Sequence, residues 1–418
     1  MDLSEKDKLA QTVRIGSKVY PLSAVPPPLT LRQDLGLLVH PAVDGQVVHV
    51  NPTGWLFETR ACITPKGDYL LMFPDRLATA PPEANGHYGS TKPKVNDLVA
   101  YRSSDRGKSW QGPTKPIHAD YNLHGFIPLI PHGSSRLYCF GTQPMPGHFN
   151  GIENSAIGYR YSDDDGLNWS GVQLIEPLND PGFEGMSVMR MTQTPSGTWL
   201  LGTHTGGKWF PLGDGTYTTW SRAYVLRSAD QGRSWTLCPG PRETGWYLPT
   251  YDRMDEPRPI SVGGSEVLMQ FRTSEGHLWQ SRSCDDGKTW EAPAPTTLIH
   301  SDAPPMLFHL SDGKTLIAFH HNSFTGVHFS HGSMRDRGQL WFSTSTDGGR
   351  NWSQPRFVLA NAFAETWANP WKDQQCSYID MFTDQGLLHI FMPHRWQRAL
   401  HLWIREGDLE KFPVDFGT

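Results

Sequence analysis

One pattern, S-x-D-x-G-x-x-W, occurs five times in the 418 residues of this chain. Each copy follows a short run of alternating apolar and polar residues. Its tryptophans are Trp110, Trp169, Trp235, Trp290 and Trp352, so successive copies lie 59, 66, 55 and 62 residues apart. Four fixed residue types recurring at this spacing cannot be chance. A repeat of about 60 residues without a long helical period indicates an array of small, similar units.

The chemistry of the repeated residues is that of a hairpin turn. The aspartate can accept backbone N–H groups inside the turn, the glycine can adopt a positive φ, and the tryptophan can fold back over the hairpin. We therefore interpret these residues as parts that hold the fold together, not as catalytic groups.

A second class of hairpin alternates with the copies of this pattern. Each member is a strand, a turn containing glycine, and another strand, as alternation with a period of two predicts. The six segments span residues 61–73, 126–140, 188–202, 258–271, 306–319 and 378–391. Radial repetition of small antiparallel sheets is a β-propeller. We expect an all-β chain with six blades, and seven if the N-terminal hairpin over residues 37–50 forms its own blade instead of completing one with the C-terminal strands.

The composition limits the remaining possibilities. We expect a poorly ordered arm over residues 1–30 and a single propeller domain over residues 31–418, because no shift in composition marks a second domain. The chain has 37 basic and 42 acidic residues, a formal net charge of -5, which argues against a nucleic-acid or anionic-membrane partner. No run of about 18 apolar residues could span a membrane. The N-terminus lacks an apolar signal segment, so we expect a cytoplasmic protein, or a secreted or periplasmic one if the N-terminus was processed.

No cofactor or metal is expected. The five cysteines are scattered and form no C-x-x-C pair, which favours reduced thiols over disulfides or a zinc site. The 18 histidines include no pair at zinc-motif spacing on a helix.

The repeats, together with the order of the hairpins, resemble the sialidase (neuraminidase) superfamily with its Asp-box, or BNR, repeats. The resemblance covers roughly residues 50–400. It places Arg60 at the arginine that opens the family's first hairpin. It also matches Glu256 and Arg272 to a glutamate and an arginine that flank a later hairpin. Arg337, with Arg335 as the alternative, matches a third arginine. The resemblance implies that three arginines clamp the carboxylate of an acidic sugar.

The chain departs from this family at the hydrolytic residues. Cys376 occupies the position of the nucleophilic tyrosine, and Tyr378 lies two residues further on. The loop that should carry the general-acid aspartate offers His87 and Tyr88 instead. The departures suggest a relative that acts on a carboxylated sugar by other chemistry, such as that of propeller-type polysaccharide lyases or histidine-dependent glycosidases.

Residues at equivalent strand ends of different blades are the site candidates, because propeller ligands bind where these ends converge. Neutral histidine and tyrosine can transfer a proton near neutral pH, whereas arginine recognises a planar carboxylate with two hydrogen bonds. The catalytic candidates are His124, His204, Tyr378 and Glu256. The substrate-binding candidates are Arg60, Arg76, Arg272, Arg337, Arg258, His321, His394 and His87. The alternative is that the histidines fill the channel and bond to the backbone.

Tryptophan is also unusually frequent, with 16 residues, of which eleven lie outside the five repeated turns. Aromatic faces suit sugar rings, although ordinary packing is equally expected for about half of the loop tryptophans. Those in loops include Trp209, Trp220, Trp246, Trp367, Trp371 and Trp396.

Together these features predict an enzyme that cleaves a glycosidic bond at a carboxylate-bearing sugar in an acidic oligosaccharide or polysaccharide. Arginines would bind the carboxylate, and histidine or tyrosine would transfer the proton. Two alternatives stay open: a lyase that cleaves next to a uronic acid by β-elimination, and a non-catalytic carbohydrate-binding propeller.

Overall fold

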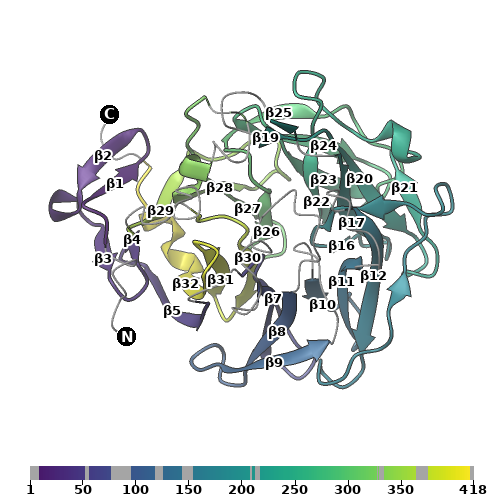
Figure 1. Cartoon of the computed structure of the whole chain (residues 1–418), viewed down its shortest axis with the longest axis horizontal. Helices are drawn as coiled ribbons and strands as arrows, with labels where there is room; N and C mark the ends of the chain where they lie inside the picture. The colour runs from purple at the N-terminus through teal and green to yellow at the C-terminus, as the bar shows by residue number, and fades with distance from the viewer. Residues whose placement is uncertain are drawn as a thin grey trace. The chain divides into compact units, whose positions relative to one another are not determined.

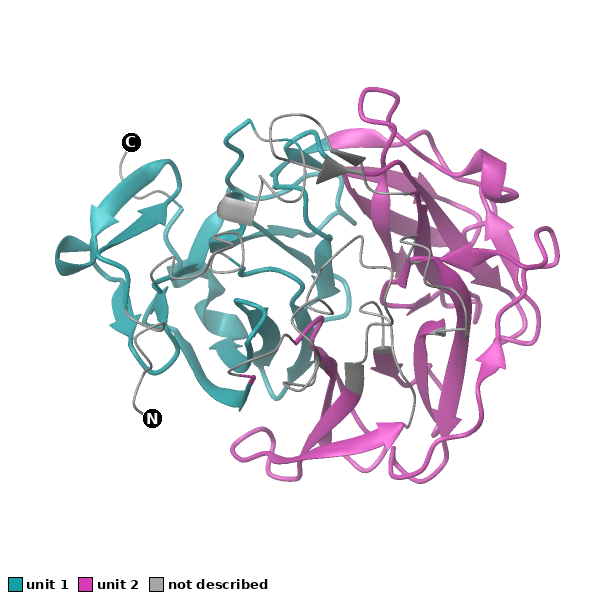
Figure 2. Cartoon of the chain, viewed as in Figure 1, with its two compact units in different colours: residues 1–50, 274–278, 296–418 teal, residues 51–273, 279–295 magenta. Residues whose placement is uncertain are grey.

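The computed structural model describes residues 9–51, 56–76, 96–117, 126–143, 154–207, 210–211, 217–326, 328, 334–363 and 375–414. These residues form antiparallel sheets joined by turns and short 3₁₀ segments, and no α-helix occurs among them. The chain divides into two compact units, drawn in different colours in Figure 2. The first unit comprises residues 1–50, 274–278 and 296–418, and the second comprises residues 51–273 and 279–295.

The second unit contains the sheets from the middle of the chain. Its first sheet has the order β6-β7-β8-β9 (Arg60–Ile63, Tyr69–Arg76, Asn96–Ser103, Gln111–Ile117). The next has the order β10-β11-β12-β13 (Phe126–Leu129, Leu137–Gln143, Ser155–Ser162, Gln173–Leu174), and β14 (Glu184–Gly185) also pairs with β12. The third has the order β15-β17-β20-β21 (Ser187–Val188, Trp199–Gly206, Ser221–Ser228, Thr236–Cys238), and β16 (Thr192–Gln193) also pairs with β17. A separate two-stranded sheet pairs β18 (Phe210–Pro211) with β19 (Tyr217–Thr218).

A fourth sheet begins in the second unit. It has the order β22-β23-β24-β25 (Asp255–Gly263, Glu266–Arg272, His277–Ser283, Ala294–Ile299), and the division between the units falls within β24 and β25.

The first unit contains both ends of the chain. One sheet has the order β26-β27-β28-β29-β4-β3 (Met306–His309, Leu316–His320, Gln339–Ser345, Arg356–Asn361, Leu37–Val39, Thr30–Arg32). The last sheet has the order β30-β31-β32-β5 (Asp380–Asp384, Leu387–His394, Arg398–Arg405, Val43–Val50). Six sheets of the described residues therefore begin with one of the six predicted hairpins, and they are the six blades of an all-β propeller.

The N-terminal segment over residues 37–50 is divided between two blades. Its first strand, β4, pairs with β3 and β29, whereas β5 pairs with β32, as Figure 1 shows where the purple strand β5 lies beside the yellow strand β32. The prediction that this segment completes a blade with the C-terminal strands is confirmed. Its interpretation as a hairpin is wrong, because β4 and β5 pair with different neighbours and not with each other.

The expected arm over residues 1–30 also contains regular structure. Strands β1 (Thr12–Ile15) and β2 (Lys18–Pro21) pair with each other. Val13 and Ile15 are buried and pack in one apolar cluster with Trp341 and Phe357. Strand β1 has this contact because its alternate side chains are apolar and have an apolar surface to cover, and the expectation of a poorly ordered arm stays a prediction. The expectation of one propeller domain over residues 31–418 stays a prediction.

The copies of S-x-D-x-G-x-x-W form five turns of one geometry, here called the box turns. Strands β8, β12, β20, β24 and β28 each end at the serine of a copy. In every box turn the serine Oγ donates to the aspartate Oδ1 at 2.8 Å and accepts the glycine N–H at 2.7 or 2.8 Å. The glycine and the residue before it both have positive φ. The turns join consecutive paired strands, so their interpretation as hairpin turns is confirmed.

Candidate functional site

A group of charged side chains is buried in the second unit, and we call it the arginine cluster. None of its seven members exposes more than 6% of its surface. The members are Glu58, Arg60, Arg253, Asp255, Glu256, Arg258 and Arg272. Charged residues are rarely buried unless they are paired, so a cluster of this size needs a specific arrangement of the backbone around it.

Two copies of the tripeptide E-x-R build much of the arginine cluster. Glu58 and Arg60 lie at the start of β6, and Glu256 and Arg258 lie at the start of β22. Both glutamates have positive φ, 30° for Glu58 and 44° for Glu256. Because positive φ is unfavourable for residues other than glycine and neither glutamate belongs to a box turn, this strain marks the two strand starts as candidate functional positions.

A close approach of two strands supports the irregular start of β22. The pairing of β22 with β23 shifts its register between Asp255 and Arg258. A Cβ atom placed on Gly202 of β17 would lie 1.7 Å from the carbonyl oxygen of Pro257. Only glycine fits at position 202, and its absent side chain lets the Glu256–Pro257 backbone pack directly on β17.

Ion pairs form within two parts of the arginine cluster, one before and at the start of β6 and one around the start of β22. Arg60 Nη2 lies 3.1 Å from Glu58 Oε2, and Arg272 Nη1 lies 2.9 Å from Glu256 Oε2. Arg253 contacts Asp255 Oδ2 through Nε at 2.7 Å and Nη2 at 2.5 Å. The cluster contains four guanidinium groups and three carboxylates, so its members carry one more positive charge than negative charges.

The surroundings of Asp255 shift the pKa of its carboxyl group. Burial alone would raise the pKa of its carboxyl group, but favourable electrostatic interactions with Arg253, His204 and Arg272 outweigh this and hold the pKa well below its ordinary value. Asp255 is therefore ionised at neutral pH, where it stabilises the cations around it.

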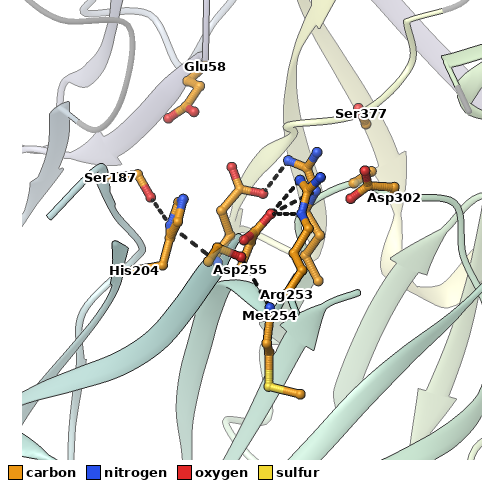
Figure 3. A network of polar contacts seen from close by, with 12 residues as sticks. Glu58, Ser187, His204, Arg253, Met254, Asp255, Asp302 and Ser377 are labelled. Atoms are coloured by element: carbon orange, nitrogen blue, oxygen red, sulfur yellow. Dashed lines mark hydrogen bonds and ion pairs between the residues drawn. The ribbon is translucent and has the colours of Figure 1, made fainter. Parts of the chain in front are cut away.

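His204 of β17 lies beside the arginine cluster (Figure 3). Its Nδ1 is 2.9 Å from Ser187 Oγ and 3.4 Å from the backbone nitrogen of Glu256. A backbone N–H can only donate, so Nδ1 accepts in this arrangement and the proton of the neutral ring lies on Nε2. The Ser187 hydroxyl can donate to Nδ1 in that state and accept from it when the ring is protonated.

Segments distant in sequence contact each other within this unit. Arg190, between β15 and β16, donates from Nη1 to the carbonyl oxygen of Ala61 in β6 at 3.4 Å, although 129 residues separate them. The backbone N–H of Ser261 in β22 donates to Thr192 Oγ1 at 2.9 Å. These contacts bring side chains from the first strands of different blades within reach of one another.

The first unit brings together two other candidates. Arg337 is fully buried, donates from Nη1 to Gln375 Oε1 at 3.3 Å, and also donates to the carbonyl oxygen of Asp302. Its guanidinium carbon lies 5.8 Å from the ring centre of Tyr378. Tyr378 has a φ of 59°, and its ring centre lies 5.1 Å from that of Trp396.

His321 and His394 are fully buried and neutral. His321 Nδ1 lies 2.8 Å from the carbonyl oxygen of Gln339, and its ring stacks on His300 at 4.7 Å. Burial lowers the pKa of His321 to about 3. His394 Nε2 lies 3.0 Å from Asn361 Oδ1, and burial lowers its pKa well below the ordinary value. His321 therefore bonds to the backbone and His394 to a side chain, and the contact of either histidine with substrate stays a prediction.

The other candidates are less fully placed. His87 and His124 lie outside the described residues. Arg76 is placed through its backbone, as the last residue of β7 opposite Asn96. Arg60 and Arg272 belong to the second unit and Arg337 to the first, so the predicted three-arginine clamp stays a prediction.

The sequence analysis missed Glu58, Ser187, Arg253 and Asp255. The two E-x-R copies were visible in the sequence and would have identified Glu58. Asp255 immediately precedes Glu256, so the D-E-P-R segment contains two acids, and the family resemblance matches only Glu256. Ser187 and Arg253 had no sequence signal, because their roles depend on contacts with His204 and Asp255.

Within the described ranges, no three His, Cys, Asp or Glu side chains gather as a metal ion would require. A helix of the length and apolarity needed to cross a membrane is likewise not found in that part of the chain.

Comparison with known proteins agrees with this architecture. The family model of the BNR repeat-like domain matches residues 128–390, more than half of the chain. A xyloglucanase from Paenibacillus sp is 24% identical over 246 residues, which are 53% of this chain and 21% of that protein. The chain thus spans about a fifth of the length of this curated relative.

Similar solved structures show the fold. The Hadza microbial sialidase Hz136 superposes with a TM-score of 0.63 at 15% identity, covering 88% of this chain and 69% of the sialidase. An α-L-arabinofuranosidase from Fusarium graminearum superposes with a TM-score of 0.56 at 14% identity, covering 89% and 99% of the two chains. An intramolecular trans-sialidase from Ruminococcus gnavus gives 0.55 at 12% identity, covering 92% and 100%. The chain belongs to the BNR repeat-like domain family, and its fold is the six-bladed β-propeller of sialidase-like proteins.

Proposed function

We propose that this chain is a carbohydrate-active enzyme that cleaves a glycosidic bond at a carboxylate-bearing sugar. The names of its relatives support the broader part of this proposal, because a xyloglucanase, an arabinofuranosidase and several sialidases all act on saccharides. The acidic substrate rests on the residues of this chain.

The arginine cluster is the observation that carries the proposal. Its four guanidinium groups exceed its three carboxylates, and arginine presents a planar fork that matches a carboxylate. Burial strengthens such pairing because few water molecules compete for the hydrogen bonds. A sugar carboxylate carries the single negative charge that would balance the excess positive charge of the cluster.

The same cluster suggests which groups would handle the proton. Glu58, Asp255 and Glu256 each pair with an arginine, so these acids position the cations. His204 is then the candidate proton donor. When its ring is protonated, Ser187 Oγ can accept from Nδ1, and Asp255 stabilises the positive charge. Nε2–H can then donate to the leaving oxygen as water adds to the anomeric carbon, and the proton that this water loses passes to solvent.

The proposal is tested by incubating the purified chain with sialyllactose, oligogalacturonates, glucuronate-containing polysaccharides and neutral xyloglucan. We expect new reducing ends from an acidic substrate and none, or far fewer, from the neutral one. New reducing ends that carry an unsaturated, ultraviolet-absorbing uronate would show β-elimination instead of hydrolysis. Binding of acidic sugars without any cleavage would show a carbohydrate-binding module and would overturn the proposed enzymatic activity.

A further inference from the structure

Two aromatic side chains are exposed beside the site in the second unit. Trp220 exposes 40% of its surface and Tyr247 exposes 45%, and they are the only aromatic residues among the exposed large apolar side chains of the described ranges. We propose that Trp220, Arg222 and Tyr247 form a separate subsite for a neutral pyranose ring, and we call these three residues the aromatic platform. The inference rests on the proposed function in that both sites would bind one saccharide chain.

Arg222 connects the two rings. Its guanidinium carbon lies 3.8 Å from the ring centre of Tyr247 and 5.6 Å from that of Trp220. The guanidinium group is itself held by Asp252, through Oδ1 at 2.5 Å and the carbonyl oxygen at 3.0 Å, and by the carbonyl oxygen of Ser221 at 2.9 Å. The aromatic platform is therefore fixed before a ligand arrives, which lowers the entropic cost of binding.

Trp220 is held from the other side by Gly207. The Gly207 N–H donates to the Trp220 carbonyl oxygen at 3.0 Å, and Thr219 Oγ1 donates to the Gly207 carbonyl oxygen at 2.6 Å. A Cβ atom on Gly207 would lie 1.9 Å from the indole Nε1. The indole thus lies directly over a backbone that has no side chain, and it keeps this position although it is exposed.

The chemistry of the aromatic platform fits a neutral sugar. The electron-rich face of an aromatic ring attracts the C–H groups of a pyranose, and its area covers one sugar ring. Arg222 and Asp252 together carry no net charge, so they offer donors and acceptors for hydroxyl groups without attracting an anion. The arginine cluster has the opposite character, with its excess of positive charge.

The backbone places the aromatic platform next to the arginine cluster. Arg222 lies opposite Thr205 in the β17–β20 pairing, one residue from His204 and its partner Ala223, so Arg222 and His204 lie at the same end of the paired strands and on opposite faces of the sheet. Ser221 Oγ accepts the Met254 N–H at 3.1 Å. A hydrogen bond between the Ser221 hydroxyl and Asp255 also helps to lower the pKa of Asp255. Trp220 lies three residues from Ala223, which is about 10 Å along an extended strand. One oligosaccharide could thus place an acidic sugar in the cluster and a neutral one on the aromatic platform.

Affinity electrophoresis tests this inference with three neutral polysaccharides, xyloglucan, hydroxyethylcellulose and galactomannan, cast separately into native gels. We expect the wild-type chain to be retarded by at least one of them. Trp220→Ala should weaken this binding about 10-fold or more, as for a central aromatic contact. Trp220→Phe, which keeps an aromatic face, should retain part of the affinity.

Two controls separate this inference from the proposed function. Leu178→Ala changes another exposed apolar residue of the same unit, 69% exposed, and should bind like the wild type. Arg272→Gln should lose cleavage of acidic substrates and yet keep the retardation by neutral polysaccharide. Wild type that is not retarded in any gel, or Trp220→Ala that is retarded as strongly as wild type, would overturn the aromatic platform.

Discussion

The box turns and the arginine cluster use similar parts for opposite purposes. In both, carboxylates accept several hydrogen bonds and residues other than glycine adopt positive φ. In a box turn, all of the partners of the aspartate lie within four residues, as Ser228 and Ser234 do around Asp230. Such a unit can be copied, and the chain contains five copies with nearly the same distances.

The arginine cluster occurs once and is assembled from distant segments. His204 and the Glu256 backbone are 52 residues apart, and Arg272 and Glu256 are 16 residues apart on paired strands. Its positive φ values fall on Glu58 and Glu256 at strand starts, where no turn requires them. The charged residues of the box turns thus hold the fold, whereas charged residues assembled from distant segments are the candidates for function.

Arg272→Gln should have the largest effect of the substitutions considered. It removes a buried cation that pairs with Glu256 and that would bind the substrate carboxylate. Truncating one partner of a buried charge pair in a binding site costs about 2–5 kcal/mol of binding free energy, so we expect kcat/KM for an acidic substrate to fall about 1,000-fold. Arg136→Gln is the matched control, because Arg136 forms an exposed pair with Asp163 and its loss should change kcat/KM less than twofold. Equal losses in the two variants would contradict a special role for the arginine cluster.

Trp235→Ala tests whether a box turn has a purely structural role. Trp235 is 3% exposed, packs near Trp199 and Phe140, and donates from Nε1 to the Gly232 carbonyl oxygen at 3.1 Å. We expect the free energy of unfolding to fall by about 3 kcal/mol, as for other large buried aromatic residues. Urea unfolding measures this change, and substrate affinity of the folded variant should not change. A variant of normal stability that no longer binds substrate would refute a purely structural box turn.

His204→Ala tests whether His204 transfers the proton. We expect turnover of an acidic substrate to fall about 100-fold, the usual order for losing a general acid or base, with little change in melting temperature. Ser187→Ala should have a smaller effect of the same kind, because the imidazole would lose its hydroxyl partner at Nδ1. His132→Ala, at an exposed position of the same unit, is the control. Turnover that survives in His204→Ala would move the proton transfer to another group.

Asp230→Asn should have the smallest effect, and one that depends on pH. Burial acts to raise the pKa of this carboxyl, but the hydrogen bonds from Ser234 and Ser228 outweigh it and lower the pKa to about 2. Because an unfolded aspartate has a pKa near 4, the ionised turn stabilises the fold above about pH 4, and this contribution is lost as pH falls through about 2.

Melting temperatures between pH 6 and pH 2 measure this effect. The wild type should lose more stability than Asp230→Asn over the acid part of the range, by under about 1 kcal/mol since the carboxylate is only partly buried. Parallel curves for the two proteins would show that the charge of the box aspartate does not matter.

Local patterns made most of the fold predictable. The six hairpins, the box turns and the lack of α-helices in the described part of the chain follow from alternation and turn residues that lie close together in sequence. The separation of β4 from β5 was not predicted, because β29, which pairs with β4, and β32, which pairs with β5, lie more than 300 residues away in the chain.

The site was predictable only in part, for the same reason. The resemblance identified Arg60, Glu256 and Arg272, and position on a hairpin end identified His204, all of which lie in or beside the arginine cluster. Arg253 and Ser187 lie in segments without a repeated pattern, and they are recognised by what they contact. The approach of β17 to Pro257 at Gly202 depends on two strands that no sequence period relates.

The central claim, that the arginine cluster recognises a sugar carboxylate, is tested most directly with one pair of substrates. The acidic oligosaccharide that the chain cleaves is compared with the same oligosaccharide after chemical reduction of its carboxyl groups to primary alcohols. A site built for a charged partner rejects an analogue that lacks it, so we predict a kcat/KM about 100-fold or more lower for the reduced compound. Equal kcat/KM values for the acidic and the reduced substrate would contradict the account.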